Sequence, residues 1–352
     1  MPLPVATQTS VDALPQRRRF RVSPVQVLAF VFIGLIVFWL GANLIDDPTH
    51  FLDLFLVGLT IGMVYALIAL GYSLVYGILE LINFAHGDVM MVGTFLGYGV
   101  AQQLGAEHQS SLWGVLLIFL AAMAGCAVLG FIIERFAYRP LRDKPRLTAL
   151  ITAIGISFIL QTVGLVWKGP APVSIRDDIL PNSEIFHIGK ADMTWNQLIV
   201  FVVTIPTLLA LVWLVQKTKS GKAMRAVAQD KDAAAMMGIN VNRTISFTFL
   251  TAGCLAGFAG VLYALFATNV QFDTGFRLGL FAFTAAVIGG IGNLPGAVLG
   301  AILIGLIENF NDGLTRFTPG SDWKSTIIFV ILILTLVFRP EGLLGERTPE
   351  GG

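Results

Sequence analysis

Charge is the property that this chain has least of. Only 13% of its 352 residues are charged, whereas 55% are hydrophobic and the mean hydropathy is +0.78. Soluble domains carry about 25% charged residues. A single water-soluble core does not need so much apolar material, so the composition excludes an ordinary soluble domain and indicates a chain embedded in lipid.

Cysteine and histidine are also scarce, with two and four residues. Cys126 and Cys254 lie in long apolar stretches, which predicts buried packing residues rather than a disulfide or a metal site. His86 and Asp88 form an H-x-D pattern that lacks the H-E-x-x-H spacing of a zinc site, and no other histidine or cysteine is near. We therefore predict no metal site.

Catalytic and nucleotide-binding patterns are missing as well. A phosphate-cradling loop needs G-x-x-x-x-G-K-[ST]. The two Gly-Lys pairs, at 189–190 and 221–222, are each followed by alanine. We find no nucleophile–base pair, so we predict no catalytic residues and no enzyme activity. A net charge of +1 gives no reason to expect a nucleic-acid partner.

The chain contains many long runs without acidic or basic residues. They are 25–45, 54–79, 89–106, 112–133, 147–167, 193–216, 244–268 and 278–307. A helix needs about 20 apolar residues to span the hydrocarbon of a bilayer. The last run is interrupted by "GGIGNLPGA" (289–297), which predicts two short helices, and another short span is expected near 322–338. The fold class predicted is all-α: a polytopic helical membrane bundle of about ten segments, with broken or short helices.

The basic residues predict the orientation. If the N-terminal tail is cytoplasmic, the tail, the segments 134–146 and 217–243, and the C-terminal tail hold 17 of the 23 lysines and arginines. The positive-inside rule then places both termini in the cytoplasm. The longest outer loop, 168–192, contains three prolines. It is either an ordered loop, a docking surface or a plain connector.

The cytoplasmic segment "GKAMRAVAQDKDAAAMMGIN" (221–240) is amphipathic. Lys222, Arg225, Gln229 and Asp232 recur at helical spacing and predict one polar stripe. Gly221 is expected to precede this helix and Gly238 to end it. Such a helix either lies on the membrane surface or inserts into the groove of a soluble partner.

Two further stretches combine glycine with polar residues between apolar runs. The first, "LINFAHGD" (81–88), contains Asn83, His86, Gly87 and Asp88. We expect a break between spans here, since Gly87 can adopt dihedral angles that other residues avoid. A break frees backbone groups that need polar partners. The polar side chains then either cap the next helix or line an inner pathway or gate.

The second stretch is "IGGIGNLPGA" (288–297), on the same predicted side of the membrane. Its gate candidates are Gly289, Gly290, Gly292, Asn293, Pro295 and Gly296. Paired broken helices indicate a transport pathway. Five polar residues within the spans are either pathway-lining or packing residues: Thr60, Tyr65, Tyr72, Ser73 and Thr284.

Four blocks in this order resemble one known family. They are "GLTIGMVYALIALGYSLVYGILELINFAHGD" (58–88), "ERFAYRPLRDKPRLTALITAIGISFILQ" (134–161), the segment 221–240, and "FTAAVIGGIGNLPGAVLGAILIG" (283–305). They are similar to the first membrane permease subunit of bacterial high-affinity branched-chain amino acid ABC importers. The resemblance covers residues 51–345. An extra N-terminal tail and span (1–50) precede it, and a C-terminal tail (346–352) follows.

The resemblance implies an importer of several subunits in the bacterial inner (plasma) membrane. This chain would form half of the pathway with a second homologous permease. Two cytoplasmic ATP-binding subunits would hold ATP and Mg, so that this chain binds no cofactor, and an extracytoplasmic substrate-binding protein would deliver the solute. The residues expected to couple the chain to the ATPase are Gly221, Lys222, Arg225, Ala226, Asp230 and Gly238.

Two alternatives remain open from the residues. Relatives in the wider family carry urea or short amides, and one sequence does not separate these substrates from hydrophobic amino acids. An ion-coupled secondary transporter is the other alternative. It usually needs ionisable groups near the middle of the membrane, whereas Glu80, Asp88, Glu134 and Glu308 are expected at the ends of spans.

Overall fold

The computed structural model describes residues 24–105, 111–142, 144–173, 184–188, 191–267, 270–316 and 318–345. The long helices are α1 (Pro24–Asp46), α2 (Pro48–Leu79), α3 (His86–Leu104), α5 (Leu112–Ile133), α6 (Arg146–Lys168), α8 (Trp195–Lys217), α11 (Val241–Phe266), α12 (Thr274–Gly289), α13 (Leu294–Gly313) and α14 (Lys324–Phe338). Shorter elements are the π-helical turn η1 (Glu134–Tyr138), the 3₁₀ turns η2 (Arg139–Leu141) and η3 (Ser321–Trp323), α9 (Lys219–Gln229), α10 (Lys231–Met236), and the strands β1 (Glu184–Ile188) and β2 (Ala191–Thr194).

The helices confirm a polytopic helical membrane protein. In the described residues, seven helices are long and apolar enough to cross a membrane, and α12 is a shorter apolar helix. The predicted interruption of the run 278–307 is confirmed, because α12 ends at Gly289 and α13 begins at Leu294. A total of ten spans remains a prediction.

Helices α2 and α11 form the centre of the bundle. About 70% of the most apolar part of each is buried, compared with 22% for α8 and 6% for α14. Glycines let the central backbones approach closely, as is usual between membrane helices. A Cβ atom at Gly62 of α2 would lie 2.8 Å from the Cα of Ile302 in α13.

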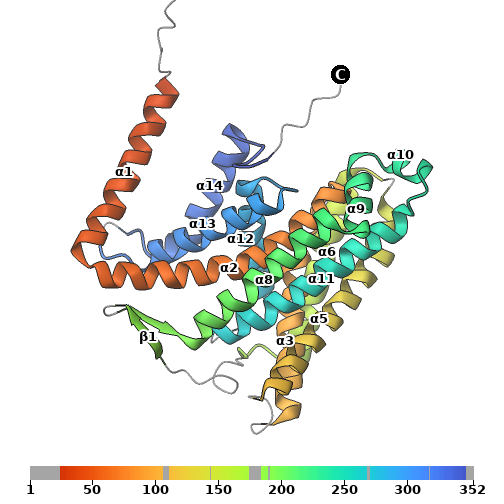
Figure 1. Cartoon of the computed structure of the whole chain (residues 1–352), viewed down its shortest axis with the longest axis horizontal. Coiled ribbons are helices and arrows are strands. Elements are labelled where there is room, and N and C mark those ends of the chain that lie inside the picture. The colour runs from red at the N-terminus through yellow and green to blue at the C-terminus, as the bar shows by residue number, and fades with distance from the viewer. Residues whose placement is uncertain are drawn as a thin grey trace, which may run out of the picture.

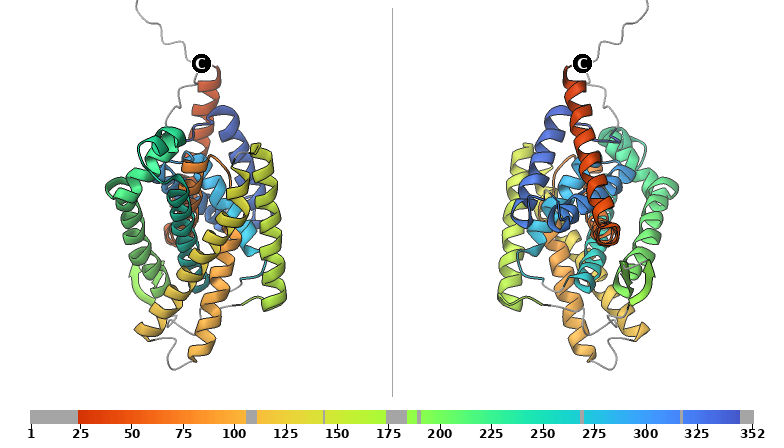
Figure 2. Two further views of the ribbon diagram at one scale, coloured as in Figure 1. Left: turned by 90° about the vertical axis from the view of Figure 1, so that its right-hand side faces the viewer. Right: turned by 90° about the vertical axis from the view of Figure 1, so that its left-hand side faces the viewer.

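The two ends of the bundle differ in what they carry (Figures 1 and 2). Helices α9 and α10 project from one end, and the C-terminal end of α14 lies at the same end. The strands β1 and β2 form an antiparallel hairpin at the opposite end. This hairpin occupies part of the outer loop expected at 168–192, so the described chain is helical apart from one small ordered hairpin.

Helix α1 leaves the bundle at an angle and is held at its C-terminal end (Figure 1). Trp39 Nε1 donates to the carbonyl oxygen of Arg316 at 2.7 Å, and the Arg316 guanidinium pairs with Asp46 at 2.7 Å. Asn43 Oδ1 accepts from the Arg316 backbone N–H. We call these three residues of α1, together with Arg316, the α1 anchor.

Asp47 separates α1 from α2 and caps the N-terminus of α2. Its side chain accepts from the His50 backbone N–H at 3.0 Å and from the Thr49 hydroxyl at 2.7 Å. These hydrogen bonds to the carboxylate lower the pKa of Asp47. Because Pro48 supplies no N–H, it is well placed in the first helical turn.

Candidate functional site

The first predicted break lies between α2 and α3, at residues 80–85. Glu80 adopts a left-handed conformation, with φ 55°, and its N–H donates to the carbonyl oxygen of Tyr76. The chain then turns back, and α3 begins at His86 beside Gly71 of α2, where a Cβ would meet the imidazole ring at 2.1 Å. Gly71 lies eight residues before the end of α2, about 12 Å at 1.5 Å per residue. Helix α3 therefore starts well inside the bundle.

The polar residues of this break are buried, and each has a different neighbour. Asn83 Oδ1 accepts from the hydroxyl of Tyr138 at 3.0 Å. The Nε2 atom of His86 has no hydrogen-bond partner within the described residues, and the His86 ring stacks edge-on against Tyr72. One oxygen of Asp88 accepts from Ser157 of α6. The expected helix cap is wrong, because no side chain caps the N-terminus of α3.

Gly87 has a different role from the one expected. It does not adopt a positive φ; the strained residue of the break is Glu80. A Cβ at position 87 would lie 2.2 Å from the carbonyl oxygen of Gly275 and 2.7 Å from the Cα of Gly279. Gly87 is therefore required for the contact between α3 and α12, and the chain reverses a few residues earlier.

The second break, at residues 290–293, joins α12 to α13. Gly290 and Gly292 have φ of 108° and 91°, which side-chain-bearing residues rarely adopt. Asn293 caps α13 by accepting from the Gly296 N–H at 3.1 Å, and Pro295 occupies its first turn. Gly289 and Gly296 bring the two helix ends together, because a Cβ on Gly289 would lie 2.0 Å from the Gly296 carbonyl oxygen.

The two breaks lie on the same side of the bundle, as expected. A Cβ at Gly77, near the end of α2, would be 3.6 Å from the Cα of Gly292. The C-terminal segment also closes the second break: the N–H groups of Leu343 and Leu344 donate to the carbonyl oxygens of Ile288 and Gly289. Sequence reasoning missed this segment, although the "RPEGLLG" pattern after α14 contains the proline and glycine of a turn.

The amphipathic segment forms two helices, α9 and α10, instead of one. Asp230 ends α9 and caps α10, since its Oδ1 accepts from the N–H groups of Asp232 and Ala233. Asp232 therefore does not continue the polar stripe of Lys222, Arg225 and Gln229, which is exposed on α9. The backbone N–H of Ile239 donates to Ala234 and that of Gly238 to Ala235. With its φ of 84°, Gly238 ends α10 as predicted.

Four of the expected coupling residues lie on α9. Gly221 is inside its first turn and does not precede it, because the helix begins at Lys219; a Cβ there would lie 2.2 Å from the Val215 carbonyl oxygen. The Arg225 guanidinium donates to the same Val215 oxygen at 2.6 Å. Lys222 is exposed, and Ala226 is half-buried. Thus Gly221 and Arg225 set the angle between α8 and α9.

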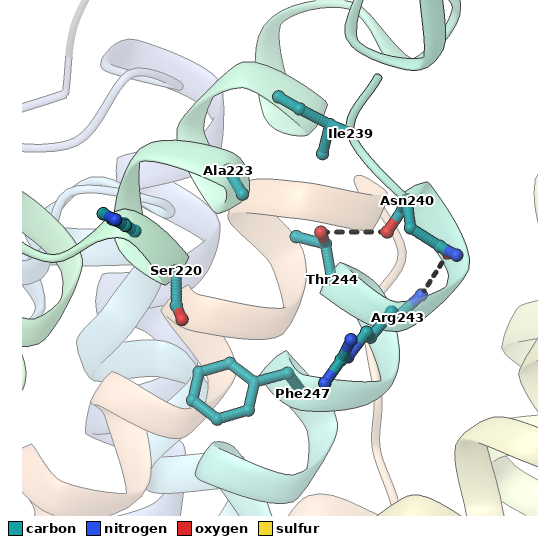
Figure 3. A pocket seen from close by; sticks show the side chains of 8 residues that line it. Ser220, Ala223, Ile239, Asn240, Arg243, Thr244 and Phe247 are labelled. Carbon is teal, nitrogen blue, oxygen red and sulfur yellow. Dashed lines mark hydrogen bonds between the residues drawn. The ribbon is translucent and has the colours of Figure 1, made fainter. Parts of the chain in front are cut away.

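A hollow of about 460 Å³ lies between α9 and the start of α11 (Figure 3). Asn240 caps α11 by accepting from the Arg243 N–H at 3.0 Å, and the Thr244 hydroxyl donates to the Asn240 carbonyl oxygen. The hollow is lined by Lys219, Ser220, Ala223, Ile239, Asn240, Arg243, Thr244 and Phe247. It therefore combines two cationic side chains with an apolar wall.

A buried network connects the start of α11 to the helical turns η1 and η2 that follow α5. Glu134 is fully buried and forms an ion pair with Arg142. Its other oxygen accepts from the Ser246 hydroxyl at 2.6 Å, and Arg142 donates to Asn242 at 2.6 Å. Tyr138, the last residue of η1, donates to Asn83 of the first break. Glu134 was expected at the end of a span, but its partners could not be read from the sequence.

The remaining expectations concern buried residues. All five polar residues considered for the pathway, namely Thr60, Tyr65, Tyr72, Ser73 and Thr284, are buried inside the chain, which supports the packing alternative. Cys126 is buried and Cys254 is half-buried, and both are free thiols. Within the described residues, no group of three or more potential metal ligands is found.

The fold and site define a polytopic membrane permease: a glycine-packed helical bundle with paired helix breaks and a pair of amphipathic helices at one end. The sequence profile described as "Branched-chain amino acid transport system / permease component" matches residues 54–336. The chain belongs to this family, whose members are the membrane subunits of ABC importers and are not themselves enzymes.

Curated relatives cover most of the chain. The high-affinity branched-chain amino acid transport system permease protein BraD of Pseudomonas aeruginosa is 40% identical over 310 residues, which are 86% of this chain and 98% of BraD. The corresponding LivH protein of Escherichia coli is 37% identical over 307 residues, covering 86% of this chain and 97% of LivH. A ribose import permease of Escherichia coli is 24% identical over 262 residues, covering 71% and 78%.

Proposed function

We propose that this chain forms half of the translocation pathway of an ATP-driven importer of branched-chain amino acids. The observation that carries the proposal is the similarity to BraD and LivH over almost the whole length of those permeases. The spans agree with this substrate class. They are largely apolar, and a branched-chain amino acid has an apolar side chain with a zwitterionic head.

The proposal includes three kinds of partner. A second homologous permease would complete the pathway, a substrate-binding protein would deliver the amino acid, and two ATP-binding subunits would supply energy and hold ATP and Mg. Support comes from the tip of the α9–α10 segment, where Met236 and Met237 are each 83% exposed. Flexible, exposed methionines suit a protein contact surface. This tip and Gly238 would contact the ATPase.

The orientation of the chain follows from the same proposal. The end that carries α9, α10 and the C-terminal end of α14 would face the cytoplasm, in agreement with the predicted distribution of lysine and arginine. The β1–β2 hairpin would face the substrate-binding protein. The membrane would be the bacterial inner membrane.

The experiment is uptake of labelled leucine in cells that contain the complete transporter, with and without this gene, in a strain that has no other leucine importer. We expect deletion to abolish uptake, and unlabelled valine to compete with leucine. The control competitors are alanine and urea. Unchanged uptake would leave the permease assignment intact but would indicate that the substrate is urea, a short amide or another small solute.

A further inference from the structure

Arg277 is the charged residue of α12, and it is exposed on the surface of the single chain. Within the described residues it forms no ion pair. Glu308 is already engaged, because Lys324 of α14 pairs with Glu308 at 2.7 Å and with Asp312 at 2.9 Å. Asp273, four residues before Arg277 at the N-cap of α12, forms no ion pair with it. Arg277 is an electrostatic neighbour of Tyr65, whose hydroxyl donates to Glu308. The Arg277 guanidinium thus has no ion-pair partner among the described residues, whereas Lys324, Glu308 and Asp312 are paired with one another.

The depth of Arg277 makes its exposure informative. It lies 12 residues before Gly289, the last residue of α12 at the second break. It also lies only three residues after Thr274, where α12 begins. At 1.5 Å per residue the distance to Gly289 is about 18 Å, so Arg277 would lie within the hydrocarbon, which is about 30 Å thick, if the second break is at the cytoplasmic surface. Arginine inside this depth is costly in lipid and normally faces protein or a water-filled cavity. We therefore expect this face of α12 to lie against protein or water, whereas the exposed sides of α6 and α8 lie against lipid.

An apolar strip runs along the neighbouring face of α12. Phe276, Leu280 and Phe283 recur at helical spacing and are half-buried, whereas Leu278, Gly279 and Phe281 on the other faces are buried. Phe283 packs against Phe84 of the first break, with ring centroids 5.5 Å apart. The strip therefore leads from Arg277 toward the first break.

We propose that this face of α12 lines the shared pathway, that Arg277 binds the carboxylate of the passing amino acid, and that the strip contacts its apolar side chain. This inference rests on the proposed function. A pathway between two permeases must be lined by residues that are accessible on each chain alone. Arg277 is exposed and its strip is half-buried, whereas Tyr65 and Tyr72 are buried. A guanidinium binds a carboxylate through two parallel hydrogen bonds.

The first test is transport by the complete importer reconstituted in vesicles. Arg277→Gln and Arg277→Glu should lower the maximal rate of leucine uptake about tenfold or more, since a charge-assisted contact is lost. Arg277→Lys should keep most of the rate. The half-saturating concentration of leucine-loaded binding protein should not change, because the proposed docking site of that protein is the β1–β2 hairpin.

The second test measures water access and does not depend on the substrate. In a Cys126→Ala, Cys254→Ala background, Arg277→Cys in the assembled importer is treated with a membrane-impermeant, charged thiol reagent. The matched control is Ile205→Cys, which is exposed on α8 and also lies 12 residues from the last residue of its helix, Lys217. We expect the thiol of the Arg277→Cys variant to react and that of the Ile205→Cys variant to remain unmodified.

The outcomes separate the two proposals. If the wild-type importer takes up leucine but the Arg277→Cys variant reacts no faster than the Ile205→Cys variant, or if Arg277→Gln transports at the wild-type rate, the inference is overturned and the proposed function stands. Loss of assembly in Arg277→Gln and Arg277→Glu, measured by co-purification of the second permease, would also overturn it, because Arg277 would then pair with that permease. Failure of the wild-type importer to transport leucine would instead reject the proposed substrate.

Discussion

Buried charge is concentrated in a few side chains. The contribution of buried charge to stability is tested most directly by a substitution in the Glu134–Arg142 pair. Glu134→Gln would remove the negative charge while Arg142, whose side chain is only 14% exposed, stays in place. Removing one partner of a buried pair costs about 3 kcal/mol or more. We therefore expect a clear fall in the thermal stability of the detergent-purified chain, measured by the loss of its monodisperse peak after heating.

The α1 anchor provides a matched control, because its ion pair is exposed. Asp46→Asn breaks the pair between Arg316 and Asp46, whose side chains are 55% and 38% exposed. Exposed pairs contribute little to stability, so the midpoint of unfolding should hardly move. Equal losses in Glu134→Gln and Asp46→Asn would contradict the view that the buried network stabilises the bundle.

Arg225 differs from its neighbours on α9 because its side chain has a backbone partner. Arg225→Gln loses the hydrogen bond to Val215, which loosens α9 against the end of α8. We expect the chain to insert and the complex to hydrolyse ATP, while leucine uptake falls several-fold. Gln229→Ala, on the same exposed stripe but outside the expected coupling residues, should transport normally. If both variants transport at the wild-type rate, the α8–α9 angle has no part in coupling.

At the scale of elements, the contact between α3 and α12 is set by glycine. A methyl group at Gly87 would lie 2.2 Å from the Gly275 carbonyl oxygen, so Gly87→Ala must separate the two helices. Overpacking of this kind typically costs about 1–3 kcal/mol. We expect a lower midpoint of thermal unfolding, with reduced uptake because α12 moves.

Gly155→Ala on α6 is the control for this substitution. It also lies within a membrane helix, but a Cβ there would meet no atom within 4 Å. The substitution should leave stability unchanged or raise it slightly, because alanine favours a helix more than glycine does. A destabilised Gly155→Ala chain would show that any loss of a helical glycine is harmful, whatever its neighbours.

The sequence predicted elements better than it predicted their contacts. The second break was found because Gly290, Gly292 and Pro295 interrupt an apolar run. The first break was placed near Gly87, but the chain reverses at Glu80, where no local signal announces a left-handed residue. The division of the amphipathic segment at Asp230 was also missed, because its helical spacing continues across the cap.

Contacts between distant segments could not be predicted because they depend on tertiary packing. The pairing of Glu134 with Ser246 joins residues 112 positions apart. The closing of the second break by Leu343 and Leu344 uses backbone groups, which carry no signature in the amino-acid sequence. Charge and hydropathy indicated which segments are helical and apolar, but they did not show which helix lies at the centre.

At the scale of the whole molecule, the described side chains of α1, from residue 34 on, are joined to the bundle by the α1 anchor (Figures 1 and 2). A chain that begins at Asp47 should therefore keep its thermal midpoint within about 2 °C, because less than about 1 kcal/mol is lost. Size-exclusion chromatography after heating would measure this. A large fall in the midpoint would show that α1 supports the bundle over its whole length.

The α1 anchor also sets an order of events during biogenesis. Trp39 and Arg316 are separated by 277 positions, so their contact cannot form until the ribosome has made nearly the whole protein. Contacts between such distant positions are slow to form. Helix α1 must therefore wait, without this contact, until the loop that holds Arg316 is made. During that interval α1 is free to meet the helices of other chains that are being inserted nearby.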